Sequence, residues 1–316
     1  MKTPLIHGIA LLAFATAGAQ AQMPAALQAV GYTAPTAPLP VAPGQVVTLF
    51  LRDISTLPGG QLRSGEAGPG TLPSTVAGIS ASISQPPMTV PLFAVRQEND
   101  CDPAASLNPA CILTSIKVQI PFEIASTTQL VVAVDGQVSR GFPLQAIADN
   151  SHVWTTCDAS WDTAPTSTCD RVIYHADGTR VTAASPAVPG EALTVRAYGL
   201  GQTSPRAETG QTSPMGTSLT ELSPGVPRVR LRFLNMPLNA PSSLPRTFIA
   251  DDVNDRNTAV ATGGLIPGIV GLYQIKVPLP QSFAPVLPCG PDVHANAIVD
   301  VITSQGSEQV SFCVKP

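Results

Sequence analysis

Charged side chains are scarce in this sequence. Asp, Glu, Lys and Arg make up 12% of its 316 residues, whereas roughly 25% is usual in soluble domains. The formal net charge is only -4, so the chain lacks the basic surface that attracts nucleic acids or anionic membranes. The composition therefore predicts no nucleic-acid partner.

Long apolar runs are also missing, since no stretch offers the roughly 18 consecutive apolar residues of a membrane-spanning helix. A shorter apolar run over residues 5–17 follows Lys2 and precedes Ala19-Gln20-Ala21, the small-x-small pattern of a signal peptidase site. We expect residues 1–21 to be a signal peptide that is cleaved before Gln22. The mature protein should then be secreted, or lie at the cell surface or in the periplasm, without a transmembrane segment.

Sequence signatures of catalysis are absent. The chain has no G-x-S-x-G, no H-E-x-x-H, no phosphate-binding G-x-x-x-x-G-K-[ST] and no dinucleotide-binding fingerprint after a strand. Catalytic triads form through space, so a secreted hydrolase would need His152, His175 or His294 beside a serine or carboxylate in a cleft. We expect a protein without enzymatic activity, cofactor or metal, and keep the hydrolase as an alternative.

Proline and glycine, in contrast, are abundant, with 33 and 25 residues, and make long helices improbable. Between them lie short segments in which apolar and polar residues alternate with the period of two that β-strands show. One face of such strands holds Val47, Leu49 and Leu51, or Leu193, Val195 and Ala197. Residues 228–234 (RVRLRFL) alternate in the same way, and residues 171–183 read as a hairpin around Asp177-Gly178.

Several of these segments occur twice in the same order. PGQVVTLFL at residues 43–51 matches PGEALTVRA at 189–197, and TSIKVQIP at 114–121 matches YQIKVPLP at 273–280. A weaker match links residues 129–137 to 296–304. The simplest explanation is a duplicated domain. We predict an all-β fold of two tandem immunoglobulin-like antiparallel β-sandwiches, with domains at 22–150 and 171–316 and a junction at 151–170.

The IKV segments carry two finer predictions. In the first copy Ile116, Val118 and Ile120 alternate with Lys117 and Gln119, which is the pattern of a half-buried strand. In the second copy a proline, Pro278, stands where Gln119 stands in the first. Because proline cannot donate to a sheet ladder, this strand should lie at an edge or end there.

The second copy also resembles the Solibacter-type C-terminal domain of acidobacterial secreted proteins. In that family a PG turn precedes a strand that ends in a GxGxT.P loop, and a later PG.VGLYQ.N..VP phrase follows. The residues that match are Gly199, Gly201, Thr203, Pro205, Pro267, Gly268, Gly271, Leu272, Tyr273 and Gln274, while Lys276 replaces the usual Asn. The resemblance extends more weakly to the first half and is hardest to see over residues 57–100. It implies export and a repeated β-rich module, and assigns no catalytic residues.

Six cysteines fall into three local pairs: Cys101 with Cys111, Cys157 with Cys169, and Cys289 with Cys313. Sequence alone allows 15 connectivities for six cysteines, and we predict disulfides between these neighbours because their loops are short. A zinc site is the competing interpretation. It is disfavoured because no pair has C-x-x-C spacing and no histidines lie three to five residues apart.

The segment from Ser151 to Asp170 is the first candidate for ligand binding, because it contains both tryptophans. Trp154 and Trp161 could stack on sugar rings while Asp158 and Asp162 accept hydrogen bonds from hydroxyl groups, which would make the protein an extracellular carbohydrate-binding module. The alternative is that the tryptophans pack into the junction between the two domains. Sequence does not name the partner, which we expect to be an extracellular protein or polysaccharide.

Two further segments are weaker candidates. The row formed by Arg228, Arg230 and Arg232 could meet acidic groups, but such a row is more commonly a solvated strand face or a guard against edge-to-edge pairing. Residues 251–257 (DDVNDRN) could bind Ca²⁺ through oxygens, yet they lack the ordered calcium loop and read better as a polar turn. The glycine-rich loop at residues 199–205 reads as turn geometry and not as a phosphate site.

Overall fold

The computed structural model describes residues 26–30, 38–101, 108–138, 141–160, 169–219, 227–234, 249–250, 259–260, 262–283, 285–290 and 293–316. β-Strands are the predominant secondary structure among these residues, which confirms the all-β fold class. The α-helix among them, α1, covers only Thr156–Ser160, and short 3-10 turns lie at Pro58–Gly60 and Pro109–Cys111. Within the described residues no helix is long and apolar enough to cross a membrane.

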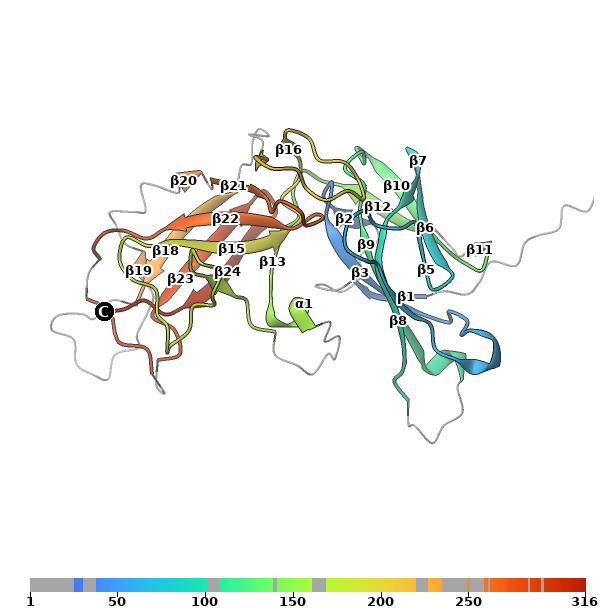
Figure 1. The fold of residues 1–316 in the computed structure, drawn as a ribbon, viewed down its shortest axis with the longest axis horizontal. Coiled ribbons are helices and arrows are strands. Elements are labelled where there is room, and N and C mark those ends of the chain that lie inside the picture. The colour runs from blue at the N-terminus through green and yellow to red at the C-terminus, as the bar shows by residue number, and fades with distance from the viewer. Residues whose placement is uncertain are drawn as a thin grey trace, which may run out of the picture.

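Two sheets face each other in the N-terminal half, drawn in blue to green in Figure 1, and we call them the first sandwich. One sheet has the order β1-β3-β9-β8-β4, with bounds Ala26–Val30, Val46–Arg52, Ile112–Gln119, Leu92–Asn99 and Ser64–Glu66. The other has the order β2-β12-β10-β6-β5, with bounds Leu39–Val41, Phe142–Ala146, Thr127–Val134, Ile79–Ser84 and Thr75–Val76. Two short strands extend it, β11 (Gln137–Val138) on β10 and β7 (Pro87–Val90) on β6.

The C-terminal half, yellow-green to red in Figure 1, forms the second sandwich. One sheet has the order β13-β15-β22-β21, with bounds His152–Val153, Ala192–Tyr198, Tyr273–Pro278 and Thr262–Leu265, and β14 (Ile173–Tyr174) also pairs with β15. The other has the order β19-β18-β23-β24, with bounds Ile249–Ala250, Arg228–Phe233, Ala297–Thr303 and Gly306–Phe312, and β20 (Ala259–Val260) also pairs with β18. A separate hairpin joins β16 (Thr203–Ser204) to β17 (Ser218–Leu219).

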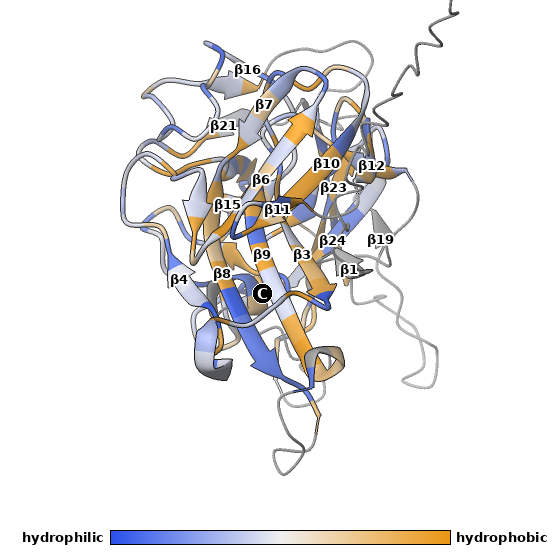
Figure 2. Ribbon diagram, turned by 90° about the vertical axis from the view of Figure 1, so that its right-hand side faces the viewer, coloured by the Kyte–Doolittle hydropathy of each residue, from blue (hydrophilic) through white to orange (hydrophobic). Residues whose placement is uncertain are grey.

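Each sandwich encloses its own apolar core. The first core contains Val47, Leu49 and Leu51 of β3, and the second contains Leu193, Val195 and Ala197 of β15. All six are at most 1% exposed, so the faces expected from the alternation are confirmed. Figure 2 shows the apolar residues along β6 and β10 of the first sandwich and the hydrophilic end of β8.

The matched sequence segments occupy equivalent strands. In the first sandwich Val47 lies opposite Val118 and Leu49 opposite Ile116, where β3 pairs with β9. Their counterparts in the second sandwich, Leu193 with Val277 and Val195 with Ile275, are opposite each other where β15 pairs with β22. The register is therefore the same in the two sandwiches, and β22 ends at Pro278 as expected. The duplication itself, the immunoglobulin-like classification and the domain bounds remain predictions.

Three disulfides join the cysteines that are neighbours in sequence: Cys101–Cys111, Cys157–Cys169 and Cys289–Cys313. The predicted pairing is confirmed. Each bridge closes a loop within one sandwich, because the sequence separations are only 10, 12 and 24 residues. The expected signal peptide lies outside the described residues.

The half-buried pattern expected for residues 116–120 is wrong. Lys117 and Gln119, which were expected to face solvent, are only 8% and 0% exposed. The face of β9 that is turned away from its own core is covered, because the second sandwich packs there. The contact between the two halves of the molecule therefore lies on this face of β9.

Candidate functional site

The two sandwiches meet in a mixed aromatic and apolar group of side chains, which we call the junction cluster. Trp154 at the end of β13 packs against Tyr198 of β15, with ring centroids 5.6 Å apart. On the first sandwich, Phe93 of β8 belongs to the same group. The remaining members are Val46, Ile266 and Leu272. Residues from both halves of the chain thus share one small core.

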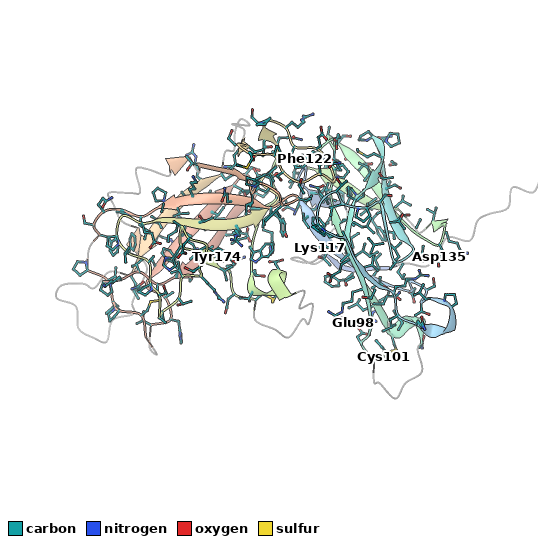
Figure 3. All side chains as sticks on the ribbon, viewed as in Figure 1. Glu98, Cys101, Lys117, Phe122, Asp135 and Tyr174 are labelled. Atoms are coloured by element: carbon teal, nitrogen blue, oxygen red, sulfur yellow. A yellow bond between two sulfur atoms is a disulfide. The ribbon has the colours of Figure 1, made fainter. Side chains whose placement is uncertain are left out.

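Lys117 of β9 extends into this cluster (Figure 3). Its ammonium nitrogen lies 5.7 Å from the ring centroid of Phe93 and 5.6 Å from that of Tyr198, within the range of cation–π attraction. Burial lowers the pKa of Lys117 below 10.5, and the carboxylates of Asp158 and Glu66 act in the opposite direction. One cation therefore interacts with aromatic rings of both sandwiches.

A second contact passes through the loop between β9 and β10. Phe122 is 2% exposed and belongs to the core of the second sandwich, although its neighbours in sequence belong to the first. Its backbone N–H donates to Thr209 Oγ1 at 2.9 Å, and its carbonyl accepts from Gln202 Nε2 at 2.6 Å. The first sandwich thus places an aromatic side chain inside the other core.

Three of the glycines that carry the family resemblance lie at this junction. Gly199 and Gly201 have φ values of +74° and +81°, and a Cβ there would overlap the carbonyl oxygens of Asn150 and Ala148. Gly271, with φ of +66°, lies against Gly44 and Val46 of the first sandwich. Turn geometry and the close approach of backbone atoms therefore account for these glycines. The motif in the sequence marks their positions but does not show which residues they contact.

The structure gives Asp158 a local role. Its carboxylate Oδ2 accepts from the backbone N–H of Thr155 at 2.8 Å and from Thr155 Oγ1 at 2.7 Å, and the N–H of Asp158 donates to that hydroxyl at 3.3 Å. This reciprocal arrangement caps the first turn of α1. His152 Nε2 lies 2.8 Å from the same oxygen. Burial raises the pKa of Asp158, but these hydrogen bonds outweigh it and lower the pKa below 3.8.

These contacts bear on the carbohydrate hypothesis. Trp154 is half-buried and tilted by 43° against Tyr198, so it packs at the junction as the alternative predicted. Trp161 and Asp162 lie outside the described residues, as does the candidate calcium segment 251–257. In the described part of the chain, no group of three His, Cys, Asp or Glu side chains could hold a metal ion.

The arginine row has a partner that sequence reasoning missed. Asp300 of β23 lies opposite Arg230 in the ladder and is fully buried. It accepts from Arg230 Nε at 2.9 Å and from Arg232 Nε and Nη2 at 2.9 and 2.7 Å. Among the described residues only Arg228 of the row lacks an ion pair. Two of the three proposed ligand-binding arginines thus neutralise an internal carboxylate.

His175 is the histidine with the most elaborate environment. Its Nδ1 lies 2.6 Å from Glu191 Oε1, and its Nε2 lies 3.1 Å from the carbonyl oxygen and 3.3 Å from the hydroxyl of Ser185. Partial burial lowers the pKa of His175, but the hydrogen bonds to Glu191 and Ser185 outweigh it and raise the pKa above 6.5. Both ring nitrogens thus have hydrogen-bond partners within the segment that joins β14 to β15.

Comparison with known proteins adds little. No protein-family model matches the chain, and no curated protein matches its sequence. Among solved structures, the Yersinia pseudotuberculosis adhesin InvE is similar over 87% of this chain and 57% of that chain, with 15% sequence identity and a TM-score of 0.19. The chain spans less than two thirds of that structure, and so low a TM-score does not indicate a common arrangement of sheets. The resemblance to the Solibacter-type family stays a prediction.

The junction cluster makes an alkaline pH dependence of stability testable. The pKa of Lys117 is lower in the folded than in the unfolded protein, so the unfolded state binds more protons just below pH 10.5. Stability should therefore rise with pH in that window, by at most about 1.4 kcal/mol per pH unit for one group. Above about pH 10 the trend should reverse, because burial raises the pKa of Tyr198 and Tyr273.

Urea unfolding between pH 7.5 and 11 measures this dependence. Lys117→Met should remove the rise, and Tyr198→Phe should keep the rise and weaken the later fall. A rise of equal slope in wild type and Lys117→Met would assign it to other groups and contradict the prediction.

Proposed function

We propose that the chain is a secreted, non-catalytic module with a structural or adhesive role at the cell envelope. Its two sandwiches would be tandem immunoglobulin-like copies that act as one rigid unit. The observation that carries this proposal is Phe122, whose ring belongs to the core of the second sandwich although its backbone belongs to the first. A linker between independently moving domains would not bury such a side chain across the boundary.

Other features support export. Three disulfides are typical of proteins that fold in an oxidising compartment. The apolar run before Ala19-Gln20-Ala21 fits a signal peptide. The resemblance to a secreted family points the same way, and its motif glycines at the junction fit a role in joining repeated modules. The mature chain would begin at Gln22.

The absence of catalysis is supported by the environment of His175. A general base needs a ring nitrogen free to accept the serine proton, whereas Nε2 lies closer to the Ser185 carbonyl than to its hydroxyl. The hydrogen bonds of His175 therefore hold the hairpin at residues 173–181 against the loop before β15.

Two assays on the mature protein test the proposal. Sedimentation with isolated cell envelopes of the source organism should show saturable retention, and panels of chromogenic esters and glycosides should show no turnover. Turnover that is lost in Ser185→Ala but kept in the matched control Ser204→Ala would overturn the non-catalytic role. Absence of retention would overturn the adhesive role and leave a purely structural one.

The carbohydrate-binding alternative keeps a separate test. Titration with soluble envelope and plant polysaccharides should leave tryptophan fluorescence unchanged if the indoles are packed at the junction. A saturable change that is lost in Trp154→Ala or Trp161→Ala would instead favour the carbohydrate-binding module.

A further inference from the structure

A cavity of about 480 Å³ opens on the second sandwich and shares no residue with the junction cluster. Its walls come from the segment after the Cys157–Cys169 loop, from the end of the β14 hairpin, and from the outer face of β24. The polar side chains that line it are Arg171, Arg180, Thr182, His294, Gln309 and Ser311. Its size lies within the usual range of small-ligand sites, roughly 300–1,000 Å³.

The walls of this cavity are held by covalent and backbone bonds. Cys169 and Cys313 both line it, and each belongs to a different disulfide. The hairpin wall is fixed by the hydrogen bond from the Val181 N–H to the Ile173 carbonyl at 3.0 Å. The β24 wall is joined to the loop before β15 by a hydrogen bond in which the Ala187 N–H donates to the Cys313 carbonyl at 2.9 Å. The cavity is thus shaped before any ligand arrives.

The charged side chains that line the cavity are those of Arg171, Arg180 and Asp170. Arg171 is already paired with Glu308, so Arg180 is the cation that an incoming anion would meet. Glu308 positions Arg171, because its Oε1 accepts from Arg171 Nη2 at 3.1 Å while its Oε2 accepts from the Val153 N–H at 2.9 Å.

Arg180 differs from Arg171 because its guanidinium N–H groups donate no hydrogen bond to any residue that the structure describes. It is exposed, and in the described part of the chain it has no ion pair or hydrogen bond from its side chain. The planar guanidinium offers a fork of donors that matches a carboxylate bidentately. One arginine is therefore held in place and the other is available for an incoming acid.

We propose that this cavity binds the carboxylate of a uronic acid residue in an extracellular polysaccharide. Arg180 and Arg171 would hold the carboxylate, and the amide and hydroxyl groups of Gln309, Ser311 and Thr182 would meet the sugar hydroxyls. The buried side chains of Val181 and Phe312 give the base of the cavity an apolar surface for the ring. The inference rests on the proposed function in one respect, that the ligand is retained and not cleaved.

Isothermal titration calorimetry with trigalacturonate tests this assignment. The mature protein should bind the acid saturably and at one site, and should bind its fully methyl-esterified form at least tenfold more weakly, because the ester lacks the charge that the arginines recognise. Arg180→Gln should weaken binding of the acid at least tenfold without changing the melting temperature. The matched control Arg206→Gln, which removes an exposed arginine of the same sandwich outside the cavity, should leave the affinity within twofold.

Three other outcomes would overturn the inference. Equal affinity for acid and ester would show that the carboxylate is not recognised, and equal weakening by the two variants would show a general charge effect. No saturable heat with trigalacturonate would remove the uronate site and leave the structural role intact. Release of reducing ends during the titration would contradict the non-catalytic function while leaving the binding site in place, so the two failures are distinguishable.

Discussion

Replacement of Phe122 by alanine is expected to destabilise the protein by about 3–5 kcal/mol and to separate its unfolding into two transitions. The ring is 2% exposed and lies in the core of the second sandwich, so its loss creates a cavity there. The same ring connects that core to the first sandwich, because the Phe122 backbone continues from β9. The variant should therefore lose both packing and coupling.

Differential scanning calorimetry distinguishes these two losses. The control is Phe283→Ala. Phe283 packs against the same core and stacks on Phe233 with ring centroids 4.6 Å apart. Unlike Phe122, it follows β22 and so belongs to the second sandwich itself. Phe283→Ala should lower the melting temperature while wild-type cooperativity is kept. Two transitions in the wild-type protein, or one cooperative transition in Phe122→Ala, would show that this residue does not couple the sandwiches.

The strands and the disulfides were predictable because their signals are local. An alternation of period two reports which face of a strand is apolar, and a slip of one residue would expose the whole face. The sequence match places Val47 with Leu193 and Val118 with Val277, and these matched positions pair in the same register in the two sandwiches. Short loops between cysteines favour neighbour pairing for the same local reason, since closing a short loop costs little entropy.

The junction was not predictable from these signals. Alternation shows that Lys117 and Gln119 share the polar face of β9, but not that another sandwich covers that face. Gln119 Oε1 accepts from the Gly210 N–H at 2.6 Å, a partner 91 residues away in sequence. The glycines of the family motif were the available signal, because a close backbone approach needs a residue without a side chain.

Asp300 illustrates a signal that the sequence did contain. The segment AIVDVIT places one acidic residue inside an otherwise apolar strand, at Ala297–Thr303. A buried carboxylate needs a cation or several hydrogen-bond donors. The arginine row on β18 supplies these cations. Arg230 lies 70 residues earlier in sequence, so only the strand order brings the two together. Alternation within β18 places the three arginines on one face of the strand, but it does not show which residue lies opposite them in the sheet.

Removal of both arginines that face Asp300 is the second change with a large expected effect. Arg230→Ala with Arg232→Ala leaves the carboxylate, whose side chain is 0% exposed, without its cations. An uncompensated buried charge costs about 3–5 kcal/mol. Asp300→Val in the wild-type background should cost less, because the Arg230 and Arg232 side chains are 37% and 19% exposed and can turn toward water. The penalty should therefore depend on which partner remains.

A thermodynamic cycle in urea measures this asymmetry. Adding Asp300→Val to the double arginine variant should restore most of its stability, because the charge that lacked a partner is gone and valine favours a strand. Arg228→Ala is the matched control, since Arg228 lies on the same strand and forms no ion pair with any residue that the structure describes. This change should alter stability by less than about 0.5 kcal/mol. If the double variant were no less stable than this control, the carboxylate would have to be satisfied by other donors, and the arginine row would again be available for a ligand. A large loss with recovery in the triple variant would instead assign Arg230 and Arg232 to the sheet.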